Sequence, residues 1–482
     1  MRQKLLLEFP KTPTGIDGLD EVTGGGFPKG RPTLVCGSAG CGKTLFGMQF
    51  LAKGISEYNE PGVFMSFEET KNDLAQNVKS LGIDLEKLIA DNKLRIDHVR
   101  IERTEIEETG EYDLEGLFIR LNHAIDSIGA RRVVLDTIES LFGGIQNSAV
   151  LRSELRRLFR WLKEKGVTTV ITGERGDKTL TRQGLEEYVS DCVILLDFRI
   201  IEQIATRRLR IVKYRGSTHG TNEYPFLIDQ DGISVLPITS LKLEHTVSDE
   251  IISTGLAELD MLFDKGGFYK GSSMLLTGSA GTAKTILASY FTLSSCKRKD
   301  KTLYLSFEES PEQLVRNMQS VGINLSPYLK SKMLHIHSSR PSLQGLEMHL
   351  LILHKLIEKL KPKTVIVDPI SSLLSVGSIG EVRDMLVRLI DLLKTNNINA
   401  YFTSLTHEST LEEKDLTVNA VSSLADIWIT LKNKKQDKQR GRCLRIVKSR
   451  GMGHESGTQY FSISSNGIKL EKNKKLLTHL ES

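Results

Sequence analysis

The sequence predicts an α/β fold that is built twice along the chain, with a mainly parallel central sheet in each half. Three observations support this prediction: a glycine-rich loop between a strand-like run and a helix-like run, an imperfect second copy of that loop, and apolar strand segments that alternate with amphipathic helix segments. A length of 482 residues is too great for one ordinary core, so two or three domains are expected.

The first glycine-rich loop lies between a β-type run that ends at Cys36 and a helical run that starts at Leu45. Strand, G-x4-G-K-T loop and helix together are typical of a phosphate-binding loop, whereas a chance glycine turn would not explain eight matching positions. Backbone N–H groups would surround a phosphate, Lys43 would neutralise its charge and the Thr44 hydroxyl would ligate Mg²⁺. The residues expected to bind ATP here are Gly37, Ser38, Ala39, Gly40, Cys41, Gly42, Lys43 and Thr44.

The second copy of the loop predicts a second ATP site, in which Thr285 would hold Mg²⁺. Its residues are Gly278, Ser279, Ala280, Gly281, Thr282, Ala283, Lys284 and Thr285. Ala283 stands where the first loop has Gly42. Alanine is acceptable there if the residue has helical dihedral angles, so we expect nucleotide binding to be retained, with altered affinity or turnover as the alternative.

The two loops belong to a duplication that covers the whole chain. Four further segments return in the same order: Thr14–Asp20 as Thr254–Asp260, Ser66–Glu69 as Ser306–Glu309, Val133–Asp136 as Val365–Asp368, and Arg210–Gly216 as Arg445–Gly451. The sequence therefore predicts two homologous domains, residues 1–240 and 241–482, that are joined near residues 238–250. The second domain ends in a short C-terminal tail.

Within the first half, apolar runs predict strands at Pro32–Cys36, Val63–Phe67, Val133–Leu135, Val167–Thr172 and Val193–Leu196. Between them lie helical patterns such as the leucine stripe Leu151, Leu155, Leu158 and Leu162, which we interpret as a core-packing face. Parallel strands joined by crossover helices place ligands at the carboxyl ends of the strands. The glycine loop and the acidic residues that follow two of these strands would meet there.

Two kinds of acidic residue could act on ATP at that edge. Asp136 and Asp368 each end an apolar strand, where a carboxylate holds Mg²⁺ in phosphate-loop enzymes. Glu68, Glu69, Glu308 and Glu309 end the strand that follows the phosphate-loop helix in each half, where a carboxylate can deprotonate or orient water or a hydroxyl group. Repulsion within each pair would raise the pKa of one member, which makes it a better base. A pair of solvated strand-end acids is the alternative.

Basic stretches close both halves, and three interpretations apply to them. The second stretch carries Lys448 and Arg450 near its end, and the first carries Lys213 and Arg215 at the same K-x-R-G spacing. A nucleic-acid surface is one interpretation, although few aromatic residues are present to stack bases. Charge-stabilising fingers that reach the ATP of a neighbouring subunit are the second, and a solvated strand edge is the third. The regular spacing favours the fingers.

The overall composition excludes several classes of protein. The chain is 39% hydrophobic and 26% charged with a net charge of +5, which indicates an ordinary globular protein rather than a general polyanion binder. The five scattered cysteines include no C-x2-C pair, so no zinc site and no disulfide framework are expected. No signal peptide and no apolar run long enough to cross a membrane are apparent, so a cytoplasmic location is expected.

Over nearly its whole length the chain resembles the KaiC family of tandem RecA-like ATPases and autokinases. The paired loops, the repeated Ser-Phe-Glu-Glu, the strand-end Asp136 and Asp368, and Lys213-Tyr-Arg-Gly-Ser-Thr-His219 carry the resemblance. It implies a homohexamer with ATP between subunits, ATP hydrolysis in the first domain and phosphoryl transfer to the protein's own hydroxyl groups in the second. The resemblance also implies a signalling or timing role and a KaiB-like partner at the first domain.

The resemblance assigns roles to individual residues. It implies catalytic bases at Glu68 and Glu308, the latter also near the metal. It implies further ATP contacts at Ser80, Lys213, Tyr214, Arg215, Ser217, His219, Arg442, Lys448, Ser449, Arg450 and His454. Its acceptor pair, Ser-Thr in the family, aligns with Ser422 and Ser423, which face Glu187 and Tyr188 in the first half. The longer tail through which KaiA acts in clock members has no counterpart after Leu470, so KaiA-type regulation is not expected.

Two rival functions stay open from the residues. A RecA- or helicase-like ATPase that acts on DNA would use the basic stretches and would bind single strands in a salt-sensitive way. An assembly in which ATP only joins subunits would release no ADP. Both differ measurably from a ring-forming ATPase and serine autokinase.

Overall fold

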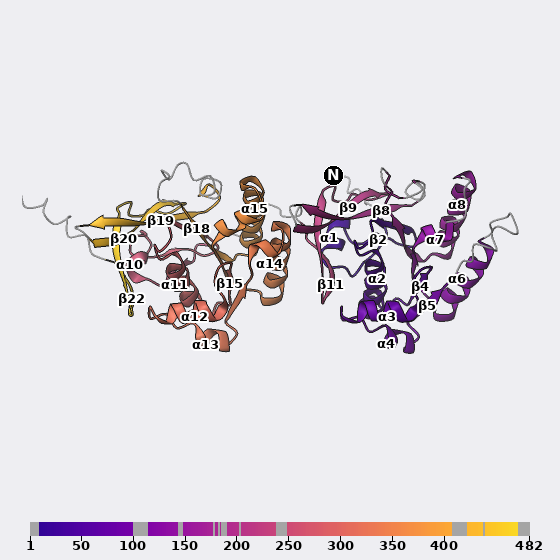
Figure 1. The fold of residues 1–482 in the computed structure, drawn as a ribbon, viewed down its shortest axis with the longest axis horizontal. Helices are drawn as coiled ribbons and strands as arrows, with labels where there is room; N and C mark the ends of the chain where they lie inside the picture. The colour runs from indigo at the N-terminus through magenta and orange to yellow at the C-terminus, as the bar shows by residue number, and fades with distance from the viewer. Residues whose placement is uncertain are drawn as a thin grey trace, which may run out of the picture. The chain divides into compact units, whose positions relative to one another are not determined.

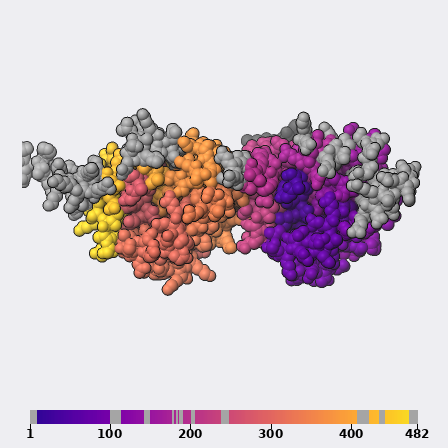
Figure 2. All heavy atoms as spheres, viewed as in Figure 1, coloured from indigo at the N-terminus to yellow at the C-terminus, as the bar shows by residue number. Residues whose placement is uncertain are grey.

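The computed structural model describes residues 9–99, 114–142, 148–176, 179–181, 184, 190–201, 204–237, 248–406, 422–436 and 439–470. The chain divides into two compact units, Met1–Ser240 and Leu241–Ser482. Each unit is one continuous run of chain, coloured from indigo to magenta in the first and from salmon to yellow in the second (Figure 2). The fold of each unit is described by itself.

The first unit is built on a nine-stranded sheet with the order β11-β10-β9-β8-β3-β7-β6-β4-β5 (Figure 1). From β8 to β5 neighbouring strands are parallel, and from β8 to β11 they are antiparallel. Its strands are β3 (Pro32–Gly37), β4 (Gly62–Ser66), β5 (Leu94–His98), β6 (Arg132–Asp136), β7 (Thr168–Glu174), β8 (Cys192–Ile201), β9 (Ile204–Tyr214), β10 (Glu223–Asp229) and β11 (Gly232–Val235). A small separate sheet pairs β1 (Lys11–Thr12) with β2 (Phe27–Pro28).

Helices cover both faces of this sheet, because each face has its own apolar cluster. On one face, residues of α1 (Leu19–Thr23), α2 (Lys43–Tyr58), α3 (Lys71–Lys79) and α4 (Leu85–Ala90) join a cluster that includes Phe46, Phe50 and Leu74. On the other, α6 (Glu115–Ile128), α7 (Ile138–Phe142) and α8 (Ser148–Lys165) join a cluster that includes Leu121 and Leu155. The central strands are therefore apolar on both sides, as in buried parallel sheets.

The second unit repeats this plan with the sheet order β16-β15-β17-β18-β14-β19-β20-β21-β22. Its strands are β14 (Ser273–Gly278), β15 (Thr302–Ser306), β16 (Leu334–Ser338), β17 (Thr364–Asp368), β18 (Asn399–Leu405), β19 (Ile427–Gln436), β20 (Gln439–Ser449), β21 (Gln459–Ser464) and β22 (Gly467–Leu470), with a small pair β12 (Ile251–Ile252) and β13 (Phe268–Tyr269). Its helices are α10 (Ala257–Asp260), α11 (Lys284–Lys297), α12 (Pro311–Gln319), α13 (Ser326–Lys330), α14 (Leu346–Leu360) and α15 (Ile379–Thr395), with 3-10 turns η1 (Pro341–Leu343) and η2 (Ile370–Ser375).

The predicted fold class is confirmed, since both sheets are mainly parallel and each carries helices on its faces. All five predicted strands of the first half are present, with ends that differ by a few residues. The interpretation of the basic stretches as strand edges is wrong. β9 pairs with both β8 and β10, and β20 pairs with both β19 and β21.

The two units pack their loop helix against the sheet in different ways. In the first, the Arg132 side chain is fully buried and its Nε donates to Glu60 at 2.7 Å. A Cβ at Gly54 of α2 would lie 2.4 Å from the Arg132 side chain, so glycine makes the room for it. In the second unit the corresponding contact joins the hydroxyl groups of Ser295 and Thr364 at 2.9 Å.

Candidate functional site

The phosphate-loop sequence of the first unit forms a turn between β3 and α2. Gly42 caps the helix with φ 102° and ψ 22°, in the region of backbone space that favours glycine. A Cβ at Gly37 would lie 2.5 Å from both the Leu196 carbonyl oxygen and the Cys41 sulfur, so only glycine fits. Lys43 Nζ donates to the carbonyl oxygens of Gly37 at 2.9 Å and Ser38 at 3.1 Å. The loop therefore holds the lysine ammonium group against its own backbone.

The second loop has the same shape, which corrects our expectation for Ala283. That residue has φ 80° and ψ 24°, so it is left-handed rather than helical, and its Cβ makes this conformation unfavourable. Lys284 Nζ donates to Gly278 O at 2.7 Å and Ser279 O at 2.9 Å, and burial lowers the pKa of Lys284. The fold of this unit therefore maintains the loop against a local backbone cost.

Asp136, at the end of β6, lies directly beside the loop of the first unit. Thr44 Oγ1 donates to Asp136 Oδ2 at 2.8 Å, and the Thr172 hydroxyl of β7 donates to Asp136 Oδ1. Burial raises the pKa of the Asp136 carboxyl, while the two hydroxyl donors act to lower it. The structure thus brings the two predicted metal ligands, Thr44 and Asp136, into contact.

Asp368, at the end of β17, has a different partner in the second unit. Tyr304 Oη donates to Asp368 Oδ2 at 2.6 Å, and the Thr403 hydroxyl donates to Asp368 Oδ1. Burial and the Asp368 charge raise the pKa of the fully buried Tyr304 well above its usual value. Phe64 occupies the position of Tyr304 in the first unit. The tyrosine hydroxyl thus takes the place at Asp368 that Thr44 takes at Asp136.

The two glutamates of each pair have separate surroundings. Glu68 Oε1 accepts from Thr137 Oγ1 at 3.0 Å and Ser140 Oγ at 2.7 Å, both of which follow the strand-end Asp136. Glu69 Oε2 instead accepts from Asn77 of α3 at 2.9 Å. Burial is the largest cause of the raised pKa of Glu69, and the Glu68 charge raises it as expected but is the smallest contribution.

The second unit repeats this division of the pair. Glu308 Oε1 accepts from Ser372 Oγ of η2 at 3.0 Å, on the side of the strand-end Asp368. Glu309 Oε1 accepts from Asn317 of α12 at 3.0 Å. In both units the first glutamate therefore faces the residues after the strand-end aspartate, and the second faces the next helix.

The oxygen ligands of the first unit fit a magnesium ion. Mg²⁺ binds hard oxygen donors, often one or two carboxylates or hydroxyl groups with water and substrate phosphates completing the shell. The hydroxyl of Thr44 and the carboxylate of Asp136 form such a set, 2.8 Å apart. In the described parts of the chain no group of three or more His, Cys, Asp or Glu side chains could hold a metal by itself. A metal here would depend on phosphate oxygens.

The two basic residues at the end of β20 contact the candidate acceptor serines. Lys448 Nζ donates to the carbonyl oxygens of Ser422 at 2.8 Å and Ala425 at 2.7 Å, and the Arg450 guanidinium donates to the Ser423 carbonyl oxygen. Burial, followed by the charge of Arg450, lowers the pKa of Lys448. Both cations thus hold the backbone of the serine segment.

The corresponding residues of the first unit are less fully described. Lys213 lies opposite Val193 in the β8–β9 ladder, and the Arg215 guanidinium is 3.7 Å from the Asp191 carboxylate. Asp191 is also 2.7 Å from Lys163 Nζ of α8. The residues that align with the serines, Glu187 and Tyr188, lie outside the described residues.

The remaining predicted ATP contacts lie at separate positions around each sheet. Tyr214 is buried and donates to Gly26 O at 2.8 Å, Ser217 Oγ donates to Thr218 O at 2.9 Å, and His219 Nδ1 lies 2.9 Å from Gly220 O. Ser80 caps the end of α3. Arg442 Nε donates to Gly281 O of the second loop at 3.0 Å, Ser449 ends β20 and His454 bridges to Phe263. Within the described residues, Arg442 is the member of this set with a hydrogen bond to the phosphate loop of its own unit.

Cys41 lies inside the first loop but is buried, and burial raises the pKa of its thiol. A thiolate is the reactive form, so this environment favours a small structural residue over a redox-sensitive one. All five cysteines are buried thiols that form no disulfide.

Several polar residues of the site were not predicted from the sequence. They are Thr172 and Thr403 on the aspartates, Ser140 and Ser372 on the first glutamates, Asn77 and Asn317 on the second glutamates, and Tyr304. Six of them form pairs that occupy corresponding positions in the two halves, so a residue-by-residue alignment of the halves would have found them. Tyr304 has no such signal, because Phe64 replaces it.

Comparison with known proteins agrees with this geometry. The family model described as "ATPase: KaiC" matches residues 12–240 and 252–475. A Synechocystis protein named "Circadian clock protein KaiC2" is 54% identical over 96% of this chain and 82% of its own length. Proteins named "Circadian clock oscillator protein KaiC" are 37% identical in Synechococcus elongatus, over 95% of this chain and 88% of theirs, and 36% identical in Thermosynechococcus vestitus, over 96% and 89%.

These similarities span both units and confirm the family that the sequence motifs suggest. In the described residues no helix is long and apolar enough to cross a membrane. The two phosphate loops and their strand-end aspartates lie in the two matched segments. The chain belongs to the KaiC family of ATPases, and its two units are tandem RecA-like domains that bind ATP.

Proposed function

We propose that this protein forms an ATP-bridged homohexamer that hydrolyses ATP in the first unit and transfers phosphate to Ser422 and Ser423 in the second. The observation that supports this most directly is the contact of Lys448 and Arg450 with the serine segment. Cations that hold this segment place two hydroxyl-bearing residues next to groups that attract phosphate. In a ring, these groups would face the ATP of the neighbouring subunit.

In the first unit, Glu68 is proposed as the base that activates water. Hydroxyl groups of Thr137 and Ser140 fix one of its oxygens, which leaves the other oxygen to accept a proton. Lys43 and the loop N–H groups would bind the phosphates, and Lys213 and Arg215 of a neighbour would stabilise the charge that develops. Mg²⁺, held by Thr44 and Asp136, would neutralise charge on the phosphate oxygens.

In the second unit, we propose that the same arrangement of residues acts on a hydroxyl group of the protein. The serine Oγ forms a bond to the terminal phosphorus, the bond to the bridging oxygen breaks, and ADP leaves. Glu308 accepts the serine proton, with Ser372 fixing one of its oxygens. Because Tyr304 already donates to Asp368, we assign this unit slower hydrolysis and a greater share of transfer.

The physiological role proposed for these two activities is that of a cytoplasmic signalling or timing regulator. The basis is the printed names of the relatives, which describe circadian clock proteins. A KaiB-like protein at the first unit is the regulatory partner that the resemblance suggests.

Incubation of the purified protein with γ-labelled ATP, followed by phosphopeptide mapping, tests the transfer step. We expect label on Ser422 or Ser423, loss of that label in Glu308→Gln, and retention in Glu312→Gln, an exposed glutamate on α12 that serves as the control. Glu68→Gln should abolish most ADP release. A protein that releases ADP but never labels these serines would lack the kinase activity.

The ring is tested by light scattering with and without ATP. We expect assembly with nucleotide and dissociation without it. A protein that is monomeric under both conditions would exclude the proposal that basic residues of one subunit reach the ATP of its neighbour. The DNA-dependent alternative predicts that single-stranded DNA accelerates ADP release and binds in a salt-sensitive way. Turnover that is unchanged by DNA would exclude it.

A further inference from the structure

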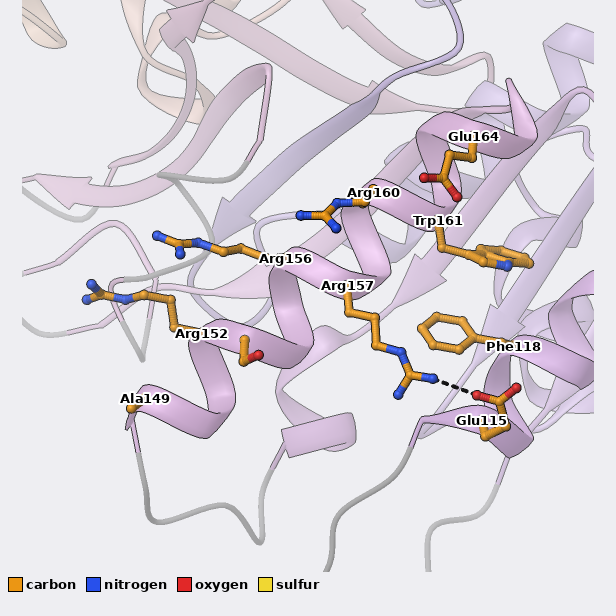
Figure 3. A pocket seen from close by; sticks show the side chains of 10 residues that line it. Glu115, Phe118, Ala149, Arg152, Arg156, Arg157, Arg160, Trp161 and Glu164 are labelled. Carbon is orange, nitrogen blue, oxygen red and sulfur yellow. Dashed lines mark hydrogen bonds and ion pairs between the residues drawn. The ribbon is translucent and has the colours of Figure 1, made fainter.

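A basic groove lies on the first unit between α6 and α8, among residues to which the proposed activities assign no role. Its cavity volume is about 880 Å³, and four arginines of α8 contribute to its lining together with Phe118 and Trp161 (Figure 3). We infer that this groove binds an acidic, helical segment of a partner protein. The inference does not depend on the proposed kinase activity.

Three of the arginines form a row that is available to a partner. Arg152, Arg156 and Arg160 are exposed, are spaced by one helical turn and extend toward the same side of α8 (Figure 3). None of the three forms an ion pair with another residue in the described part of the chain. Like charges at this spacing destabilise a helix, so the row disfavours the isolated unit.

The fourth arginine builds the groove itself. Arg157 donates to Glu115 of α6 at 2.6 Å and lies 5.0 Å from the centre of the Phe118 ring. Phe118 in turn stacks on Trp161 with ring centres 5.3 Å apart, so α6 and α8 are joined by one packed set of side chains. This set closes the α6 side of α8, while the side chains of Arg152, Arg156 and Arg160 extend to the other side of the helix (Figure 3).

The shared fold does not require this arginine row. In the helix that corresponds to α8 in the second unit, α15, Val387 and Asp391 replace Arg156 and Arg160, and Leu392 replaces Trp161. The same kind of helix therefore folds without the basic row and without the tryptophan. The row is a property of the first unit alone, as expected of a specific binding surface rather than a packing requirement.

The chemistry of the groove favours a polypeptide over a nucleic acid. Single-stranded nucleic acids bind through free aromatic faces, but Phe118 and Trp161 face each other, and Arg157 and Lys165 lie over them at 5.0 Å and 5.8 Å. A helix with acidic residues at every fourth position matches the arginine row turn for turn.

The test uses the full-length protein and a fluorescent, alanine-rich helical peptide that carries glutamate at every fourth position. We expect saturable, salt-sensitive binding in fluorescence anisotropy, with much weaker binding of a peptide that has glutamine in place of glutamate. Arg160→Asp should weaken binding by about tenfold, which corresponds to the loss of a rim ion pair together with a new repulsion. The double variant Arg156→Val with Arg160→Asp should weaken peptide binding further. Because α15 carries valine and aspartate at the corresponding positions, the helix of this variant is expected to fold.

Arg131→Asp is the matched control, since Arg131 is exposed at the turn after α6 and does not line the groove. Equal weakening by Arg131→Asp and Arg160→Asp would overturn the proposal, as would equal binding of the glutamate and glutamine peptides. Tighter binding of a single-stranded oligonucleotide that Arg160→Asp abolishes would assign the groove to nucleic acid instead. A change in subunit number on Arg160→Asp, measured by light scattering, would assign it to contacts between copies of this chain.

Discussion

At the scale of single residues, the two phosphate loops differ at one position with a direct energetic consequence. Ala283 adopts φ 80°, close to the 102° of Gly42, although it carries a Cβ. Its left-handed conformation costs roughly 1 kcal/mol relative to glycine. Nothing in the amino-acid pattern indicates this angle, because it is imposed by the strand and helix that the loop joins.

Ala283→Gly is therefore expected to stabilise the second unit by about 1 kcal/mol, measured as a rise in the unfolding transition of that unit. The matched change Gly42→Ala should destabilise the first unit by a similar amount or more, since its Cβ would lie 2.8 Å from Ile228 Cδ1. An unchanged unfolding transition in Ala283→Gly would show that the left-handed backbone conformation of Ala283 has no energetic cost.

Tyr304 and Phe64 offer a reciprocal exchange at the strand-end aspartates. Tyr304→Phe introduces the residue type that the first unit has at Phe64, removes the tyrosine donor to Asp368 Oδ2 and should raise hydrolysis by the second unit about tenfold. Phe64→Tyr should lower hydrolysis by the first unit. Single-turnover ADP release, with the other unit silenced by Glu68→Gln or Glu308→Gln, measures each effect. Equal rates before and after the exchange would show that the tyrosine does not restrain Asp368.

At this scale the sequence predicts residue types better than it predicts contacts. Thr44 and Asp136 could be placed together because a phosphate loop and a strand-end acid share one edge of a parallel sheet. The different partners of Glu68 and Glu69 could not be predicted. The sequence carries no signal that the Glu68 side chain turns toward Ser140 and the Glu69 side chain toward Asn77.

At the scale of elements, α2 and β6 are matched to each other through Gly54 and Arg132. Arg132 fills the space that Gly54 leaves and pairs with Glu60, and burial lowers its pKa against the opposing effect of that pairing. Arg132→Thr should destabilise the first unit by about 3 kcal/mol, because it leaves a cavity and removes the partner of a largely buried carboxylate.

The double variant Gly54→Ser with Arg132→Thr reproduces the pair that the second unit uses at Ser295 and Thr364. It should recover part of the lost stability, whereas Gly54→Ser alone should be harmful, since a Cβ there meets the arginine at 2.4 Å. Chemical denaturation of residues 1–240 measures the free energy of unfolding of each variant, and these values give the coupling free energy between positions 54 and 132. Strictly additive effects would mean that helix and strand are not matched in this way.

Element boundaries were predictable where strands are buried on both faces. Val63, Val133 and Val193 lie in continuous apolar runs that only a central parallel strand explains. The antiparallel strands from β8 to β11 were harder to predict from the sequence, because they mix charged and apolar residues. Arg199 and Arg208 meet Glu223 across these strands, a contact between residues distant in sequence.

At the scale of the whole molecule, each unit has its own core and its own phosphate loop. We expect residues 1–240 to fold alone, to unfold in one cooperative transition and to bind ATP, because both apolar clusters of that sheet lie within the unit. Circular dichroism with heating, with and without ATP and magnesium, measures this. An aggregated or molten fragment would show that the unit depends on the second half.

The duplication itself was readable from the sequence, because loops, acids and basic stretches recur in one order. The subunit number of an assembly could not be predicted from the sequence, because the repeated motifs describe a single chain. Contacts within a unit also became visible only in the folded structure, such as those of Lys448 with the carbonyl oxygens of Ser422 and Ala425.

The Gly54–Arg132 and Ser295–Thr364 pairs also bear on how such a gene can evolve. Recombination that copied only the helix-coding segment of one half onto the other would combine a serine Cβ with the arginine, or leave the threonine facing an unfilled space. Either hybrid would be selected against, whereas exchange of a whole half would be tolerated. Matched packing pairs would thus act as a barrier to gene conversion between the two halves and would help the duplicated domains to stay distinct in sequence.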